Sequence, residues 1–179
     1  FSIKSNFSIL CFNSIQSVGN SFVIPSGPLR EPLRSISRAD CIVINGEKNL
    51  ELESTLNKNL NKKKLPIFYS KYIIKNTEKL KNKEILAFAG IGNPSNFFNL
   101  LKENKLNVKK TYSFADHHDY SQNDFDKIEN NTSAIIVTTE KDYYRIHDNQ
   151  KQNIYCVKVE LEIENENKLK DLVKQYLWK

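Results

Sequence analysis

Short apolar stretches rich in β-branched and aromatic residues recur along the chain, each bounded by polar or turn residues, a pattern that is typical of strands. Helical patterns lie between several of these stretches. Asn93 followed by Pro94 is a favourable helix start, and the apolar positions of residues 169–177 keep the spacing of an amphipathic helix. The predicted strands are residues 8–12, 41–44, 66–69, 85–89, 108–114, 134–137 and 154–159.

Strands that alternate with helices predict an α/β fold, with a mainly parallel sheet flanked by helices on both faces. In such sheets, ligands bind at the carboxyl ends of the strands. Three segments follow predicted strands, so we expect them to line one cleft at that edge: AGIGNP at residues 89–94, FADHHDY at 114–120 and TTEKD at 138–142. The region before about residue 41 is rich in Gly and Pro, which predicts an extended, loop-rich connection.

Composition and charge restrict the classes of protein. Hydrophobic residues make up 39% of the chain, with ten Phe and eight Tyr, which is enough for a packed core. The formal net charge of +6 is spread among asparagines, so a solvated basic face is favoured over a binding patch, with attraction to an anionic membrane surface as the alternative. No zinc-finger spacing or Gly-aromatic RNA motif occurs, so no nucleic-acid partner is expected.

The cysteines and the apolar runs indicate the compartment. The three cysteines, Cys11, Cys41 and Cys156, are far apart among apolar neighbours, which predicts small buried strand residues in a reducing compartment. No apolar run approaches the roughly 18 residues that a membrane span requires. We therefore expect a cytosolic or peripherally attached protein.

Asp116, His117 and His118 place a carboxylate beside two imidazoles. A neutral histidine held by a carboxylate can accept or donate a proton, and the same pair can orient a ligand or a metal. A metal site needs three or four converging ligands, which adjacent loop residues rarely supply together. Proton transfer or substrate contact is therefore the preferred interpretation, followed by surface or helix-capping histidines, and then by metal binding.

Two other segments allow two interpretations each. The glycines of AGIGNP lie between a strand and a helix N-terminus, where backbone N–H groups can meet an anion, but a tight strand-to-helix turn explains them equally well. Their spacing matches neither the dinucleotide fingerprint nor the P-loop. In TTEKD, Thr139 and Asp142 resemble a capping box, which is the preferred explanation of that segment.

Arg30, Arg34 and Arg38 recur at equal intervals, with Glu31 available to fix one of them. On a helix these arginines would share a face and could hold a phosphate with paired hydrogen bonds. Exposed ion pairs are an equally good explanation.

Together, four blocks resemble the tetraacyldisaccharide 4'-kinase family, whose members phosphorylate the lipid A disaccharide precursor on the cytosolic side of the Gram-negative inner membrane. Each block alone is a weak signal, but their order and spacing span nearly the whole chain. The blocks read GN…IPSGPLREPL…RAD…VIN at residues 19–45, AFAGIGNPSNFF at 87–98, FADHHDYS at 114–121 and VTTEKDYYRI at 137–146.

The resemblance implies the Rossmann-like C-terminal domain of a two-domain P-loop kinase. Residues 1–40 would be a remnant of the N-terminal kinase domain with the interdomain connection, and residues 41–179 the C-terminal α/β domain. It also implies ATP and Mg²⁺ as cofactors, the lipid A disaccharide precursor as substrate along the interdomain cleft, and a cytoplasmic, peripheral position at the inner membrane.

The resemblance also implies roles for individual residues. His117 would be the catalytic histidine, with His118 less favoured, acting with an acidic residue of the N-terminal domain and with Asp116 as its orienter. A structural and substrate-side role is implied for the GPLREP block, as follows: Gly27, Arg30 and Glu31.

The departures from the family pattern matter as much. No Gly-x-x-x-x-Gly-Lys-Thr sequence occurs, and Asn13 and Ser14 stand where the family shows Asp-Gly. Because phosphoryl transfer depends on a phosphate cradle, we expect a truncated form that is inactive without a separate N-terminal P-loop domain. A non-catalytic lipid-binding remnant is the alternative. A metal-dependent phosphoesterase with an Asp-His-His motif is less favoured, since His147 is the only other histidine.

Overall fold

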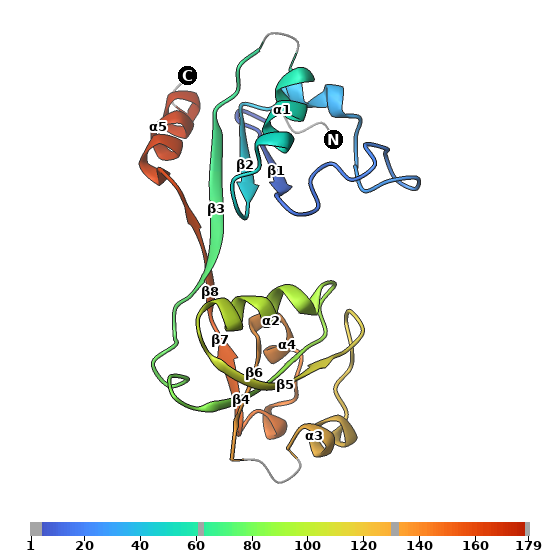
Figure 1. The fold of residues 1–179 in the computed structure, drawn as a ribbon, viewed down its shortest axis with the longest axis vertical. Helices are drawn as coiled ribbons and strands as arrows, with labels where there is room; N and C mark the ends of the chain where they lie inside the picture. Colours follow the sequence, from blue (N-terminus) through green and yellow to red (C-terminus); the bar gives the residue numbers. More distant parts are fainter. Residues whose placement is uncertain (1–4, 61–62, 130–132, 178–179) are drawn as a thin grey trace. The chain divides into compact units, whose positions relative to one another are not determined.

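The computed structural model describes residues 5–60, 63–129 and 133–177, and Figure 1 shows their path. The chain divides into two compact units. The first comprises Phe1–Lys71 with Leu161–Lys179, and the second comprises Tyr72–Glu160. The predicted division after residue 40 falls inside the first unit; it concerns the parts of a longer kinase and stays a prediction.

The first unit contains a four-stranded sheet in the order β1-β2-β3-β8. Strand β2 pairs in parallel with β1 and β3. Its apolar run is continuous because both faces are covered: Ile42 and Ile44 pack with α1, whereas Cys41 and Val43 pack with α5. The elements are β1 (Ile9–Asn13), the 3₁₀ helix η1 (Leu33–Arg38), β2 (Cys41–Asn45), α1 (Leu50–Lys58), β3 (Ile67–Ile74), β8 (Val159–Ile163) and α5 (Glu166–Leu177).

The second unit contains a four-stranded sheet in the order β5-β4-β6-β7, with every neighbouring pair parallel. Strand β4 alternates between two cores: Ala87 and Ala89 face the cluster that contains α2, and Leu86 and Phe88 face the cluster that contains α3. The elements are β4 (Glu84–Ala89), α2 (Pro94–Glu103), β5 (Asn107–Ser113), α3 (Gln122–Glu129), β6 (Ile135–Thr139), α4 (Glu140–Tyr143), the 3₁₀ helix η2 (Asp148–Gln150) and β7 (Ile154–Val157).

The predicted α/β fold with parallel sheets flanked by helices is confirmed, although the strands form two sheets rather than one. Each predicted strand is present. The stretch 154–159 is interrupted at Lys158, so it supplies β7 and the first residue of β8. The predicted helices at Pro94 and near the end of the chain are also confirmed, whereas α1 was not predicted.

The cysteines were predicted only partly correctly. All three lie in strands, and Cys41 is buried, but Cys11 is exposed and Cys156 is half-buried. The burial prediction is wrong for Cys11 because it lies on β1, the edge strand of its sheet. Within the described ranges, no helix has the length and apolar character needed to cross a membrane.

The Phe88 side chain is fully buried in the second unit and makes edge contacts with the rings of Phe114, Tyr120 and Phe125. Because truncation removes these contacts and leaves a cavity, we expect Phe88→Ala to lower the free energy of unfolding by about 3–5 kcal/mol in a denaturant titration followed by circular dichroism. Phe22→Ala is the matched control, since the Phe22 side chain is 63% exposed. Equal losses in the two variants would contradict this packing.

Candidate functional site at the carboxyl edge of the second sheet

The three segments predicted to meet at the carboxyl edge do meet there. Strands β4, β5 and β6 end at Ala89, Ser113 and Thr139, and the glycine turn, the Asp-His-His turn and α4 follow directly. Gly90 is the residue that both other segments contact. The arrangement follows from the parallel sheet, in which all carboxyl ends lie at one edge.

Both backbone groups of Gly90 have partners. Its N–H donates to Asp142 Oδ2 at 3.1 Å. Its carbonyl oxygen accepts from Arg145 Nη1 at 3.1 Å and from the backbone N–H of His117 at 3.2 Å. Arg145 Nη1 also donates to Asp142 Oδ1 at 3.0 Å, so the fully buried Asp142 carboxylate is paired with a cation.

His117 lies on an open turn. Its side chain is 72% exposed, and its φ of 62° lies in the left-handed region. The ring Nε2 is 3.8 Å from Asp116 Oδ2, which is too long for a hydrogen bond. Asp116 Oδ1 instead accepts from the backbone N–H of His117 at 3.1 Å and from Lys141 Nζ at 3.3 Å. Asp116 therefore restrains the backbone of His117 rather than its ring.

The charge around Asp116 keeps it ionised. Desolvation acts to raise its pKa, but the hydrogen bond and the positive charge of Lys141, followed by the contacts of His117, outweigh it and lower the pKa. The carboxylate therefore stays negative at the start of the turn that carries His117.

His118 has a different environment from its neighbour. Its Nε2 lies 3.1 Å from Asp124 Oδ2, and its ring stacks on Phe114 at a centroid distance of 4.6 Å. Asp124 Oδ2 also accepts from the backbone N–H and the hydroxyl of Ser121. These Ser121 hydrogen bonds, with a smaller contribution from His118, lower the pKa of Asp124 to about 2. Of the two imidazoles, only that of His117 is free of such anchoring.

The glycine turn does not fit a nucleotide phosphate. The Gly90 N–H is used by Asp142, and a Cβ built on Gly92 would lie 3.6 Å from Asp116 Oδ2, so a bound anion would approach a carboxylate. Asn93 occupies the N-cap of α2, but its side chain makes no capping hydrogen bond. The turn is therefore a tight strand-to-helix connection. As for metal ions, the described residues include no group of three or more His, Cys, Asp or Glu suited to hold one.

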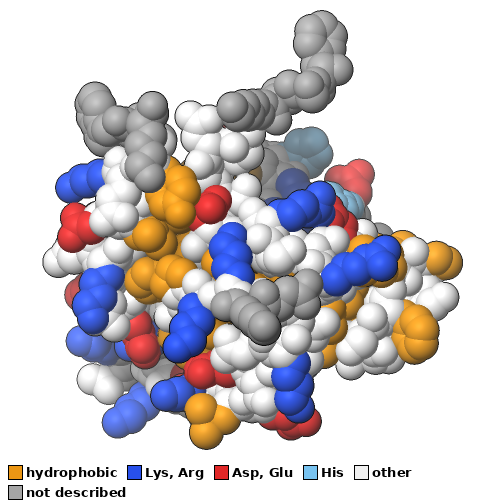
Figure 2. Space-filling view, turned by 90° about the horizontal axis from the view of Figure 1, so that it is seen from above, with side chains coloured by type: hydrophobic (Ala, Val, Ile, Leu, Met, Phe, Trp, Pro, Cys, Tyr) orange, Lys and Arg blue, Asp and Glu red, His pale blue; other side chains and the backbone are white. Residues whose placement is uncertain are grey.

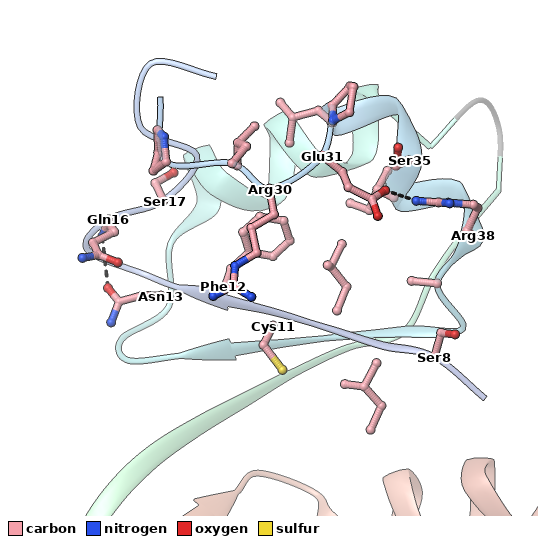
Figure 3. Close-up of a pocket in the computed structure, with 18 residues that line it drawn as sticks. Ser8, Cys11, Phe12, Asn13, Gln16, Ser17, Arg30, Glu31, Ser35 and Arg38 are labelled. Atoms are coloured by element: carbon pink, nitrogen blue, oxygen red, sulfur yellow. Dashed lines mark hydrogen bonds and ion pairs between the residues drawn. The ribbon is translucent and has the colours of Figure 1, made fainter. Parts of the chain in front are cut away.

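The second group of predicted residues lies in the first unit, around a cavity of about 660 Å³ between β1, the loop before η1 and η1 itself (Figure 3). Arg30 extends from the loop towards Phe12, and its guanidinium has no ion-pair or hydrogen-bond partner among the described residues. Glu31 also lines the cavity and pairs with Arg38.

The arginines do not share a helix face, so that interpretation of their spacing is wrong. The 3₁₀ helix begins at Leu33, after Arg30, and Arg34 does not line the cavity, whereas the predicted ion pair of Glu31 is present. Gly27 does not line the cavity either. A side chain there would overlap the Asn20 side chain and the Phe22 carbonyl, which gives this glycine a structural role.

Sequence reasoning missed two residues of the edge, Asp124 and Arg145. It gave Gly90 a turn or anion-binding role and Lys141 and Asp142 a place at a helix start, but not the contacts that join them. Thr139 does cap α4, accepting from the Asp142 N–H as predicted. That capping explanation was sufficient, so it concealed the second use of the carboxylate. The one available signal was the spacing of Asp142 and Arg145, which is the spacing of an ion pair on one helix turn.

The fold and this edge define an α/β protein whose polar side chains lie on loops that follow parallel strands, the place where such folds bind ligands. Comparison with known proteins names the family. The family model for LpxK, tetraacyldisaccharide-1-P 4'-kinase, matches residues 1–177. The chain therefore belongs to the tetraacyldisaccharide-1-P 4'-kinase family, as the sequence blocks indicated.

Individual relatives agree. The tetraacyldisaccharide 4'-kinase of Pelagibacter ubique is 38% identical over 93% of this chain and 54% of its own length, and that of Rickettsia canadensis is 35% identical over 94% and 51%. The crystal structure of "apo" form LpxK from Aquifex aeolicus in complex with ATP matches with a TM-score of 0.67 and 26% identity, covering 97% of this chain and 53% of that one. The chain spans about half the length of these relatives.

The low pKa of Asp124 predicts a pH-dependent contribution to stability. Because its pKa is depressed in the folded state, the ionised carboxylate stabilises the fold above the unfolded pKa, and this contribution is lost as pH falls towards about 2. We expect Asp124→Asn to lower the free energy of unfolding by about 1–2 kcal/mol near neutral pH, and the difference from the wild type to shrink in denaturant titrations between about pH 5 and pH 2.

Asp126→Asn is the matched control for Asp124→Asn, because Asp126 lies in the same helix and is exposed. Its effect should stay within about 0.5 kcal/mol. A deficit for Asp124→Asn that stays constant down to pH 2 would show that the hydrogen-bonded carboxylate is not the cause.

Proposed function

We propose that this chain provides the acceptor-side part of a tetraacyldisaccharide 4'-kinase, which phosphorylates the lipid A disaccharide precursor at its 4' position. The kinase names of the relatives and the match over residues 1–177 support this function. The ATP complex of the Aquifex aeolicus relative supports ATP as the phosphoryl donor. Because the first N–H of the glycine turn is not offered to a phosphate, we assign the binding of ATP and Mg²⁺ to a P-loop domain of the kinase that lies outside the half matched by this chain.

The single observation that best supports the site is the contrast between the two histidines. His118 is anchored to Asp124, while His117 exposes its ring beside the ionised Asp116. A general base needs a free nitrogen and a nearby charge that stabilises its protonated form. We therefore assign to His117 the removal of the proton from the attacking 4'-hydroxyl, and to Asp116 the stabilisation of the resulting imidazolium and the restraint of its backbone.

The cavity of the first unit supports substrate contact at Arg30. An unpaired guanidinium beside apolar walls such as Leu10 and Phe12 suits an anionic group attached to a larger, partly apolar molecule. The precursor has that character, and Glu31 would act by holding Arg38 at the rim. Basic side chains are visible across the face in Figure 2, and the net charge of +6 supports peripheral attachment to the cytoplasmic side of the inner membrane.

Lipid binding without catalysis is the second candidate function. The observation that favours it is the glycine turn, whose first N–H is used internally by Asp142 and so does not serve a phosphoryl donor. Both candidate functions predict that the lipid precursor contacts the cavity at Arg30. They differ only in whether His117 takes part in a reaction.

The catalytic assignment is tested in a chimera in which this chain replaces the half of the Pelagibacter ubique kinase that it matches. We expect phosphorylation of the precursor, and a loss in kcat of about 10²- to 10⁴-fold in His117→Asn, because the general base is removed. His118→Asn is the comparison variant, with a much smaller loss in kcat because its ring serves Asp124. Equal losses in both variants would contradict the assignment, and an active parent with no loss in His117→Asn would favour another base.

The substrate contact is tested by titration calorimetry of the purified chain with the detergent-solubilised precursor. We expect Arg30→Gln to weaken binding by about 1.5–3 kcal/mol, because a hydrogen bond to a charged group is lost. Arg34→Gln changes the net charge equally but lies outside the cavity lining, so it should leave affinity nearly unchanged. Equal weakening in both variants would indicate general charge attraction instead.

A further inference from the structure

We propose that Asp142 and Arg145 are positioning residues of the Asp-His-His turn: by holding the backbone groups of Gly90 they fix the backbone of His117 and, through it, the direction of the imidazole. The link to catalysis rests on the proposed function. The positioning itself rests on the contacts described below, which involve no ligand.

The Asp142 carboxylate has no freedom to move. It is fully buried, and each of its oxygens is occupied: Oδ1 accepts from Arg145, and Oδ2 accepts from the Gly90 N–H and from the Thr139 hydroxyl at 2.7 Å. A buried charge is tolerated only when it is paired and hydrogen-bonded. The position of Gly90 is thereby tied to the first turn of α4.

The carbonyl of Gly90 links this fixed position to the Asp-His-His turn. It accepts from the Arg145 guanidinium and from the His117 N–H, so the same oxygen joins α4 to the Asp-His-His turn. From the other side, a Cβ built on Gly90 would lie 2.8 Å from Tyr120 Oη and 3.1 Å from the Ala115 carbonyl, so the turn packs closely against the Gly90 backbone. Gly90 has one position in this packing.

The conformation of His117 needs this support. Its φ of 62° is costly for a residue with a side chain, and its N–H is shared between Gly90 O and Asp116 Oδ1. If Gly90 O moves, His117 loses one of these two acceptors, and the backbone can relax to a negative φ. The imidazole would then project in another direction.

Helix α4 also reaches the other residue of the turn. Lys141, next to Asp142 in the chain, contacts Asp116 directly at 3.3 Å, with both side chains about half exposed. The TTEKD segment and Arg145 therefore restrain Asp116 by a direct surface contact and His117 by a buried contact through Gly90. Of the two, the buried contact is less screened by solvent.

Amide hydrogen exchange measured by NMR on the 179-residue chain tests the proposal without any assay of activity. The His117 N–H reports on the turn, and the Phe114 N–H, bonded to Ala89 O at 2.9 Å on the same edge, is the internal reference. In Asp142→Asn we expect exchange at His117 to accelerate at least about 10-fold more than exchange at Phe114. The His117 ring resonances should shift as well.

The matched control is Asp148→Asn. Asp148 pairs with Lys151 at the same sequence separation, but its side chain is 97% exposed, and among the described residues it makes no hydrogen bond or ion pair with the turn. It should change exchange at neither amide. Should Asp142→Asn fail to fold, Arg145→Lys is the second variant. It keeps the positive charge beside Asp142 but replaces the planar guanidinium that contacts Gly90 O, so exchange at the His117 N–H should again accelerate more than exchange at the Phe114 N–H.

Equal acceleration at His117 and Phe114 would mean that Asp142 contributes only to overall stability, and would overturn the proposal. Selective acceleration at His117 supports it. The chimera then separates this proposal from the proposed function. A selective exchange effect in a chain whose chimera is inactive would sink the kinase assignment alone. An active chimera without the exchange effect would sink the positioning role alone.

Discussion

Parallel strands cannot be joined by tight turns, so each must be followed by a connection that crosses a face of the sheet before the next strand begins. In the second unit this constraint determines both the core and the site. Strand β4 places Ala87 and Ala89 against α2 and Phe88 against the cluster of α3, which covers both faces. Because every connection leaves from the same edge, the segments after Ala89, Ser113 and Thr139 are brought together there.

The same edge gives two adjacent histidines opposite roles. Side chains of neighbouring residues on a turn point in different directions, and here one imidazole meets Phe114 and Asp124 while the other meets solvent. The anchored ring of His118 helps to hold the loop that leads into α3. The His117 ring has no such anchor and stays exposed, so the two rings of one Asp-His-His sequence lie in different environments.

The sequence predicted what depends on local patterns and on the family. Strands such as 41–44 follow from continuous apolar runs, and the edge location of TTEKD follows from the parallel sheet. The roles of Asp142 and Asp124 depend on partners that are remote in the chain or specific to one turn. The sequence signals only one of these contacts, the Asp142–Arg145 pair, by its spacing. Asp142 bonds to Gly90, 52 positions away. Local capping already explained Asp142, and no pattern in the sequence singled out Asp124.

The arginines show the opposite error. Equal spacing of Arg30, Arg34 and Arg38 suggested a helix face, but the proline at position 32 delays the 3₁₀ helix to Leu33 and leaves Arg30 on the loop. Two of the arginines therefore differ in their contacts: Arg38 pairs with Glu31, whereas Arg30 reaches into the cavity without a partner among the described residues. The regular spacing left a shared site and exposed ion pairs equally open; the structure shows the exposed Glu31–Arg38 pair and places Arg30 on the loop before the 3₁₀ helix.

The glycine turn shows how an anion-binding geometry can be filled by the protein itself. An N–H group after a parallel strand is well placed for a phosphate, and in this chain the Asp142 carboxylate takes that position at 3.1 Å from Gly90 N. Displacing it would leave a fully buried charge with only Arg145 and Thr139 to compensate it, which is unfavourable. The Gly90 N–H is thus taken up by the protein itself, and the Gly90 carbonyl is bonded to His117 and Arg145, so the turn is part of the fold of this edge rather than an open anion site.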